Sequence, residues 1–464
     1  MRKIVSILGI PVDDLNTVEV LDRLEQFITS RRFHQVATAN VDFLIKANAD
    51  PELKCILRTA DLVVPDGMPL VWASRWMHNG LRERVTGADL VSPLAERAAA
   101  NGYRIFMLGG EPRVAQAAKA RLESLYPAVT IVGCESPDVP NLVTADCEPI
   151  LRRIEEAKPD ILLVAFGNPK QEKFIHMHRD RLNVPVCIGV GGTFDFIAGK
   201  TKRAPRVMQK LGLEFLHRWA GNPKRLGARY KQNITQFPPL IIRQVRAIDR
   251  SRDAEPVEVS VTEERDCAIL SLSGTLTGRY LDSLMEPVES AFAASRHVVL
   301  DMTAVRGADG YSLGALQNLW KRAAWAKCEV RFVNPPQRFR RALEVTDSLN
   351  LFRQFSSRAE AVAAAPVVQF SACLSAEGEG ATVAVCGSAS VAHLDKLESV
   401  LEKASQCGQV VCLDLREVSY IDCAGLYALW RFADNRKQRG LVTTCAPSTP
   451  VVQALAREKL KSIT

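Results

Sequence analysis

The chain has 464 residues, of which 47% are hydrophobic and 24% charged, and its formal net charge at pH 7 is +8. This length is too great for one hydrophobic core and suggests about three domains. The longest apolar runs, such as ILLVAF at 161–166, are strand-sized and fall far short of the roughly 20 residues that span a bilayer. The composition therefore argues against membrane-spanning helices and is ordinary for a soluble globular protein.

The N-terminus, MRKIVSILGI, combines a basic start with a short apolar run, as a signal peptide does. It lacks a small-residue cleavage site and continues into Asp13 and Asp14, so we expect a first β-strand there. The twelve cysteines form no C-x-x-C pair and no regular framework. This usage fits reduced thiols in a cytosolic protein.

Residues 1 to about 200 alternate short β-rich apolar runs with amphipathic helical stretches. The expected strands include RIFMLGG, VTIVGCE, DILLVAFG and VPVCIGVGG, and PRVAQAAKARLESLY is an expected helix. Such alternation predicts an α/β fold with a Rossmann-like, mostly parallel sheet.

A polar or glycine-rich motif follows each of several short apolar runs in this region. In chain order the motifs are TAN at 38–40, VPDGMP around Asp66, RVTGAD from Arg84, FMLGG ending at Gly110, FGNPKQE from Phe166 and GVGGTFDF from Gly189. In an open α/β sheet such positions lie at the carboxyl edge, where ligands bind. The series therefore predicts one assembled site.

Asp66 is a candidate general base, because a carboxylate at a strand end beside the flexible Gly67 can reach a substrate hydroxyl. The alternative is that Asp66 caps the following helix, MPLVWASRWM, and this motif alone favours the cap. Thr38 and Asn40 could likewise bond a sugar or nucleotide, or merely start the helix VDFLIKAN.

The glycines in these motifs permit close backbone approach to phosphates at helix N-termini. They are Gly109, Gly110 and the glycines of 189–192. Neither group is a G-x-G-x-x-G fingerprint, because Phe194 stands where the third glycine belongs. Phe194 also replaces the first glycine of a P-loop ending in AGKT at 198–201. Both nucleotide fingerprints are rejected, and a nicotinamide oxidoreductase with them.

The sequence contains no D-x-D pair for a metal–diphosphate and no metal-ligand spacing among its seven histidines. A diphosphate leaving group would then need cationic side chains. Residues 200–250 contain 13 Lys or Arg against Glu214 and Asp249, a local excess of +11. The arginines available there are Arg203, Arg206, Arg218, Arg225 and Arg229.

The basic segment also contains LGLEFLHRWAGNPKRLGARY, which predicts two helices separated by a Gly-Asn-Pro break. An interfacial helix on anionic lipid, or a diphosphate clamp, is the favoured interpretation. The alternatives are a helix that packs on the sheet with solvated charges opposite, and a nucleic-acid surface. No recognised nucleic-acid motif accompanies the segment.

The last part of the chain contains an internal repeat with an offset of 113 residues. AILSLSG at 268–274 aligns with ATVAVCG at 381–387, Asp301 falls on Asp414, and Asp309 falls on Asp422. A constant offset over such a stretch indicates two homologous α/β units of about 100 residues. A polar stretch, RAIDRSRDAEPVEVS, precedes them and is an expected linker.

The ordered motifs, together with RAPRVMQKLGLEFLHR, resemble the WecG/TagA/CpsF glycosyltransferase family over residues 1 to about 240. The resemblance implies an inverting enzyme without metal or other cofactor that moves a sugar from a UDP-sugar to a polyprenyl-diphosphate-linked saccharide. It also implies that the enzyme acts at the inner face of the cell membrane, in envelope or exopolysaccharide assembly. The implied sugars are N-acetylmannosamine, its uronic acid or glucose.

The resemblance also implies roles for individual residues. It makes Asp66 the catalytic base and places Thr38 and Asn40 near donor and acceptor. Asp195, between two phenylalanines, is the rival acid and suits a structural or donor-binding role. The remaining expected substrate-binding residues are Arg84, Gly109, Gly110, Gln171, Gly191, Arg218, Arg225 and Arg229.

The two repeat units resemble STAS domains, the fold of anti-sigma-factor antagonists, on VVLDMTAVRGADGYSLGAL and VVCLDLREVSYIDCAGLYAL. In regulatory members of that family a phosphorylated Ser or Thr follows the loop aspartate. Here Asp309 is followed by Gly310, and Asp422 by Cys423. The phosphoswitch is therefore expected to be lost, and the pair to serve protein interaction or self-association. Cys423 could be a redox sensor, but a plain small residue is favoured.

The expected fold class is α/β throughout: a Rossmann-like glycosyltransferase domain with a helical C-terminal appendage, followed by two STAS-like domains. The expected boundaries are 1–200 for the core, 201–245 for the basic appendage, 246–257 for a linker, and 258–366 and 367–464 for the STAS-like domains. The competing function is a catalytically inactive sugar-nucleotide binder that regulates through its STAS domains.

Overall fold

The structure is a computed structural model. It describes residues 3–201, 204, 205, 208, 223–248, 257–278, 281–367, 369–377, 380–407, 409–460, 462 and 463. The chain divides into two compact units. The first unit is Met1–Ser136, Ala157–Pro169 and Val184–Ala365, and the second is Pro137–Glu156, Lys170–Asn183 and Pro366–Thr464.

A six-stranded parallel sheet forms the centre of the first unit, in the order β4-β3-β8-β7-β5-β6. Its strands are β3 (His34–Ala39), β4 (Leu62–Pro65), β5 (Arg104–Gly109), β6 (Thr130–Glu135), β7 (Ile161–Ala165) and β8 (Val186–Gly189). The central strands β7 and β8 are continuous apolar runs and almost wholly buried, as a parallel sheet covered by helices requires. The predicted parallel α/β sheet is confirmed.

Helices connect these strands, and polar caps mark several of their starts. The helices are α1 (Thr17–Ser30), α2 (Val41–Ala49), α3 (Pro51–Thr59), α4 (Met68–Trp76), α5 (Gly87–Asn101), α6 (Pro112–Leu125) and α10 (Thr193–Ile197). Asn16 and Glu19 form a capping box on α1, Asp50 caps α3 and Thr86 caps α5. Such side chains satisfy backbone N–H groups that the first helical turn leaves unpaired.

The N-terminus forms the expected first strand, β1 (Ile4–Ile7), which pairs antiparallel with β2 (Ile10–Asp13). Between them Gly9 has φ +81°, and a Cβ there would lie 2.0 Å from the carbonyl oxygen of Thr346. Only glycine therefore fits this turn.

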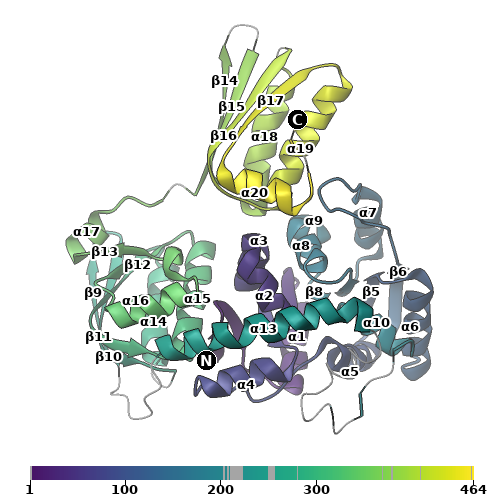
Figure 1. Ribbon diagram of the computed structural model, residues 1–464, viewed down its shortest axis with the longest axis horizontal. Coiled ribbons are helices and arrows are strands. Elements are labelled where there is room, and N and C mark those ends of the chain that lie inside the picture. Colours follow the sequence, from purple (N-terminus) through teal and green to yellow (C-terminus); the bar gives the residue numbers. More distant parts are fainter. Residues whose placement is uncertain are drawn as a thin grey trace. The chain divides into compact units, whose positions relative to one another are not determined.

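The long helix α13 (Pro223–Ala247) starts at the proline of the predicted Gly-Asn-Pro break and packs against α2 and α16 (Gln337–Val345). Figure 1 shows it as the teal helix that crosses the first unit. The helix expected before the break lies outside the described residues. Among the residues that are described, no helix is long and apolar enough to cross a membrane.

The first repeat, residues 258–363, completes the first unit with a five-stranded sheet in the order β13-β12-β11-β10-β9. Its strands are β9 (Glu258–Glu264), β10 (Cys267–Leu276), β11 (His297–Ala308), β12 (Val330–Val333) and β13 (Arg353–Phe355). Its other elements, besides α16, are α14 (Leu281–Ala293), α15 (Gly310–Trp325), η1 (Leu349–Leu351) and α17 (Arg358–Ala363). Only β9 runs antiparallel to its neighbour.

The second repeat, residues 370–457, lies in the second unit and has a four-stranded sheet in the order β14-β15-β16-β17 (Figure 1). Its strands are β14 (Phe370–Glu377), β15 (Gly380–Ala389), β16 (Val410–Ile421) and β17 (Val442–Pro447). Its helices are η2 (Val391–His393), α18 (Leu394–Ser405), α19 (Cys423–Gln438) and α20 (Thr449–Arg457). The unit also contains α7 (Glu148–Ala157), α8 (Lys170–Met177) and α9 (Arg179–Leu182).

The two repeats share irregular features as well as strand order. Their first parallel strands, β10 and β15, lie 113 residues apart, and both carry register shifts at the same two places. Asp309 caps α15 and accepts from the backbone N–H of Ser312, and Asp422 caps α19 in the same way with Gly425. Matching bulges and caps agree with the internal repeat in the sequence and indicate one fold present twice.

Candidate active site

The sheet order brings the sequence motifs into one row. Five adjacent strands, β4, β3, β8, β7 and β5, end in VPDG, TAN, GVGG, AFGN and FMLGG respectively. Hydrogen bonds link each loop to the next: Val85 N to Pro65 O (2.9 Å), Asp66 N to Ala39 O (2.7 Å), Thr38 Oγ1 to Gly189 O (3.2 Å), Val190 N to Val164 O (2.9 Å) and Gly110 N to Ala165 O (3.1 Å). The carboxyl edge is therefore one continuous structure.

Asp66 is the first residue after β4 and is half-buried. The N-cap of α4 is the following residue, Gly67, so Asp66 does not occupy the cap position. The interpretation of Asp66 as the cap of α4, which its own motif favoured, is therefore wrong. The local reason is Gly67, whose φ of +149° turns the chain between the strand and the helix.

The side chains of Thr38 and Asn40 both form hydrogen bonds within the protein at the end of β3. The buried Thr38 hydroxyl donates to Gly189 O and ties β3 to β8. Asn40 is the N-cap of α2, with Oδ1 accepting from Asp42 N (3.0 Å) and Phe43 N (3.3 Å). Because Oδ1 already accepts the two capping bonds, the amide nitrogen is the part of the Asn40 side chain that can donate a hydrogen bond to a ligand.

Arg84 precedes α5 and is oriented by an acidic neighbour. Its guanidinium lies 3.3 Å from Asp89 Oδ2, which also accepts a 2.8 Å bond from the Thr86 hydroxyl. Gly87 lies against the hydroxyls of Thr38 and Thr193, since a Cβ there would be 3.6 Å and 3.2 Å from them. RVTG, TAN and GVGG thus lie side by side.

Positive φ angles occur at three expected substrate-binding glycines: Gly109 (+94°), Gly110 (+75°) and Gly191 (+51°). At Gly109 a Cβ would lie 2.8 Å from a ring carbon of Phe166. The FMLGG loop therefore packs directly on the FGNP loop, and it leads into the N-terminus of α6 at Pro112. A helix start of this kind favours negatively charged ligand groups.

Asp195, the rival acid, lies on α10 with a partly exposed side chain. Its carboxylate is 3.7 Å from Lys200 Nζ, and the same ammonium lies 2.7 Å from Glu111. The Asp195 carboxylate is therefore held in an ion pair on α10, and its structural or donor-binding role stays a prediction.

The remaining expected residues belong to α8 and to the basic segment. Gln171 lies on α8 in the second unit, is 1% exposed and donates to Glu172 Oε1 at 2.7 Å. Arg218 lies outside the described residues, as does the side chain of Arg225 on α13. Arg229 is described, and its guanidinium lies 3.0 Å from Asp42 Oδ2.

Sequence reasoning missed a charged pair on α2. Asp42 pairs with Lys46 (2.9 Å) as well as with Arg229, and Lys46 Nζ donates to the carbonyl of Asn168 in the FGNP loop at 2.9 Å. The sequence signal for this pair is an acidic and a basic residue four positions apart, directly after TAN. Residues with this spacing face each other on a helix. These contacts connect α13, α2 and the strand edge.

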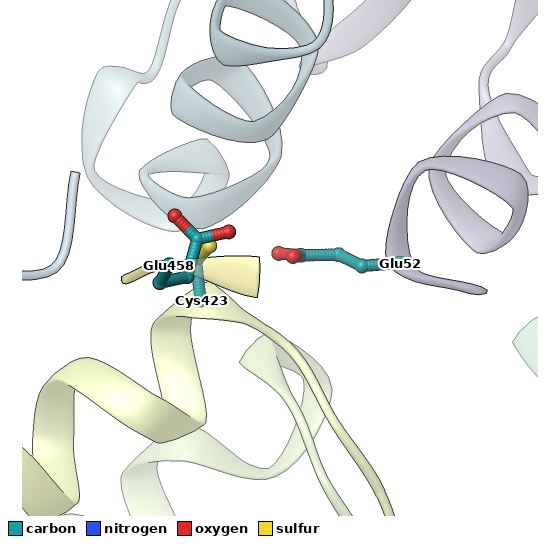
Figure 2. Close-up of side chains that lie close together, drawn as sticks. All are labelled: Glu52, Cys423 and Glu458. Carbon is teal, nitrogen blue, oxygen red and sulfur yellow. The ribbon is translucent and has the colours of Figure 1, made fainter. Parts of the chain in front are cut away.

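Cys423 and Glu458 lie close together in the second unit (Figure 2). Glu52, also labelled there, belongs to the first unit, and the three residues are not taken as a metal site. Glu458 already pairs with Lys173 at 2.8 Å. Cys423 is 1% exposed, which favours a packing role over redox sensing.

Comparison with known proteins gives two family matches. The model of the "Glycosyl transferase WecG/TagA/CpsF family" matches residues 5–251, and the "STAS domain" model matches residues 258–361. An N-acetylglucosaminyldiphosphoundecaprenol N-acetyl-beta-D-mannosaminyltransferase of Bacillus subtilis (strain 168) is 33% identical over 221 residues, 47% of this chain and 84% of that protein. The enzyme of the same name from Staphylococcus aureus (strain MRSA252) is 29% identical over 225 residues, 48% and 87% of the two chains.

Proposed function

Because the chain belongs to the WecG/TagA/CpsF glycosyltransferase family, we propose that it transfers N-acetylmannosamine from a UDP-sugar to an N-acetylglucosaminyl-diphosphate-polyprenol. The names of its relatives support this sugar and this acceptor. The observation that carries the proposal is the row of motif loops on five adjacent strands, which offers one polar, glycine-rich edge to a donor and an acceptor.

In the proposed step an acceptor hydroxyl attacks the anomeric carbon of the donor from the side opposite the leaving group. Its proton passes to Asp66, the new C–O bond forms, and the bond to UDP breaks with its electron pair. Attack from the opposite face inverts the anomeric centre. Asp66 suits the base because backbone bonds place its loop between the TAN and RVTG loops, and because Gly67, not Asp66, occupies the N-cap of α4.

The departing diphosphate needs positive charge, which protein cations supply in this proposal instead of a metal. Lys200 lies beside α10, and Arg84 is oriented by Asp89 at the row. Arg229 stands on α13, attached to α2 through Asp42. Arg218 and Arg225, also in the basic segment, remain predicted contributors.

We further propose that the first unit rests on the inner face of the membrane through α4 and α13. Trp72 and Trp76 are exposed on α4, 37% and 57%, and Ile242 is 44% exposed on α13. Arg75, Trp76, His78, Ile242, Val245 and Arg246 line a hollow of 430 Å³. A hollow lined by both apolar and basic side chains suits the interface with anionic lipid, and the N-cap of α4, Gly67, is next to Asp66.

Transfer by the purified full-length chain tests the proposed reaction. With a polyprenyl-diphosphate-N-acetylglucosamine acceptor, UDP-N-acetylmannosamine should give product in the presence of a chelator, while UDP-glucose and the uronic acid donor should give much less. Product made only with another donor would reject the assigned sugar. Activity lost on chelation and restored by a divalent cation would reject the metal-independent step.

A further inference from the structure

The first STAS domain is joined to the glycosyltransferase core by a continuous apolar interior. Leu313, Leu316 and Leu319 of α15 belong to the same buried cluster as Val5 and Ile7 of β1. The backbones approach closely as well, because a Cβ on Gly314 of α15 would lie 2.4 Å from the carbonyl oxygen of Ile4. A shared buried cluster with such close backbone approach is typical of a domain interior and not of two tethered modules.

Buried polar groups cross the same boundary and find partners on the other side. Arg58 of α3, 8% exposed, donates to the carbonyl oxygens of Gly9 (2.9 Å), Thr346 (3.1 Å) and Asp347 (2.7 Å). The last two carbonyls lie just beyond the end of α16, where a helix favours positive charge. Lys54 adds an ion pair with Asp347 at 2.8 Å.

The loop before α15 also forms hydrogen bonds with the glycosyltransferase core. Asn79 of the core donates to Asp309 Oδ2 (3.2 Å) and accepts from Gly310 N (2.9 Å). Ser312, 0% exposed, donates to Leu276 O (2.6 Å) and Asp309 Oδ1 (2.8 Å). The helix start that would face an external partner is therefore covered by the core of the same chain.

Helix α13 lies between the two domains and contacts both. Phe237 and Ile241 share the buried cluster with Phe43 of α2 and Phe339 of α16. Gln244, 0% exposed, uses both ends of its amide at the end of β1, accepting from Leu8 N (2.8 Å) and donating to Ser6 O (2.7 Å). A buried amide with both ends satisfied fixes the position of the helix along β1.

We propose that the first STAS domain is a fixed part of the transferase, whose function is to hold α13 against α2 and so keep Arg229 and the Asp42–Lys46 pair at the strand edge. The positioning residues are Arg58, Lys54 and Gln244, which act through α13 and touch no substrate. Helix α16 of this domain packs against α13 and covers one of its faces. The catalytic importance of α13 rests on the proposed function, whereas the docking itself does not.

A charge exchange across the boundary tests this proposal in the full-length chain. Lys54→Glu leaves a nearly buried carboxylate facing Asp347, and Asp347→Lys places two cations together, so both weaken docking. Hydrogen exchange of the amides in 223–247 should rise at least tenfold in each single variant and return to within about twofold of wild type when both are combined. The kcat for transfer should follow the same pattern with little change in the donor KM.

The matched control is the pair Lys119 and Glu123 on α6, whose side chains are 30% and 44% exposed. Exchanging these two residues in the same way should change neither readout. Gly314→Val, which forces α15 off β1, should reproduce the single variants without altering any charge. Unchanged exchange in α13 in the single variants and in Gly314→Val would overturn the docking role. Faster exchange with unchanged kcat would overturn the positioning role. A wild-type chain that protects α13 but transfers no sugar would reject the proposed function alone.

Discussion

Asp66→Asn is expected to lower kcat for sugar transfer about a thousandfold, within the range for loss of a general base, while the KM for the UDP-sugar changes little. Asparagine has nearly the same shape but cannot accept the proton of the acceptor hydroxyl. The backbone should be undisturbed, because the N–H of Asp66, which either residue retains, makes the bond to Ala39 O, and Gly67 is the cap of α4. Steady-state kinetics with saturating acceptor measures the effect.

The control for this variant is Asp195→Asn, the other acid at the strand edge. Its carboxylate is paired with Lys200, so its loss should cost less than about tenfold and should appear mainly in the donor KM. If Asp66→Asn keeps the wild-type rate and Asp195→Asn does not, the two roles are reversed and the assignment of the base is wrong.

Replacing Trp72 and Trp76 together by alanine should weaken binding to anionic vesicles about a hundredfold. Each indole that leaves water for the interface is expected to contribute about 1.4 kcal/mol, or tenfold in affinity. The two side chains lie four residues apart on α4 and therefore on one face of that helix. Vesicle sedimentation at fixed protein concentration measures the partition.

The control is Trp325→Ala on α15, because Trp325 is 59% exposed, as Trp76 is at 57%, but lies outside the α4–α13 surface. This variant should bind vesicles as wild type does. Equal losses for Trp325→Ala and Trp76→Ala would show nonspecific adsorption and would remove the membrane surface from the account.

Much of the first unit could be predicted from local sequence. Runs such as ILLVA are too apolar for an exposed strand, and their alternation with helical patterns indicated the parallel sheet that β7 and its neighbours form. The break before α13 was visible because Gly-Asn-Pro interrupts the helical pattern. The strand at the N-terminus was expected because its apolar run has no cleavage site and continues into Asp13 and Asp14. The shared offset of 113 residues likewise revealed the repeat before its bulges were seen.

Other features depend on partners that are distant in sequence. Gln244 bonds to Leu8, 236 residues away, and Arg58 bonds to Thr346, 288 residues away. Neither residue carries a local signal, because a lone glutamine or arginine on a helix is usually solvated. The role of Asp66 was misjudged locally for a different reason. Aspartate before a helix usually caps it, and only the structure shows that Gly67 takes that position.

Hydrogen exchange with and without UDP shows whether the loops of the strand edge form one donor site. If they do, UDP should protect several segments of the first unit at once, namely 38–40, 66–67, 84–87, 109–110 and 189–195. Protection confined to one of these loops, or found only elsewhere in the chain, would contradict a single donor site.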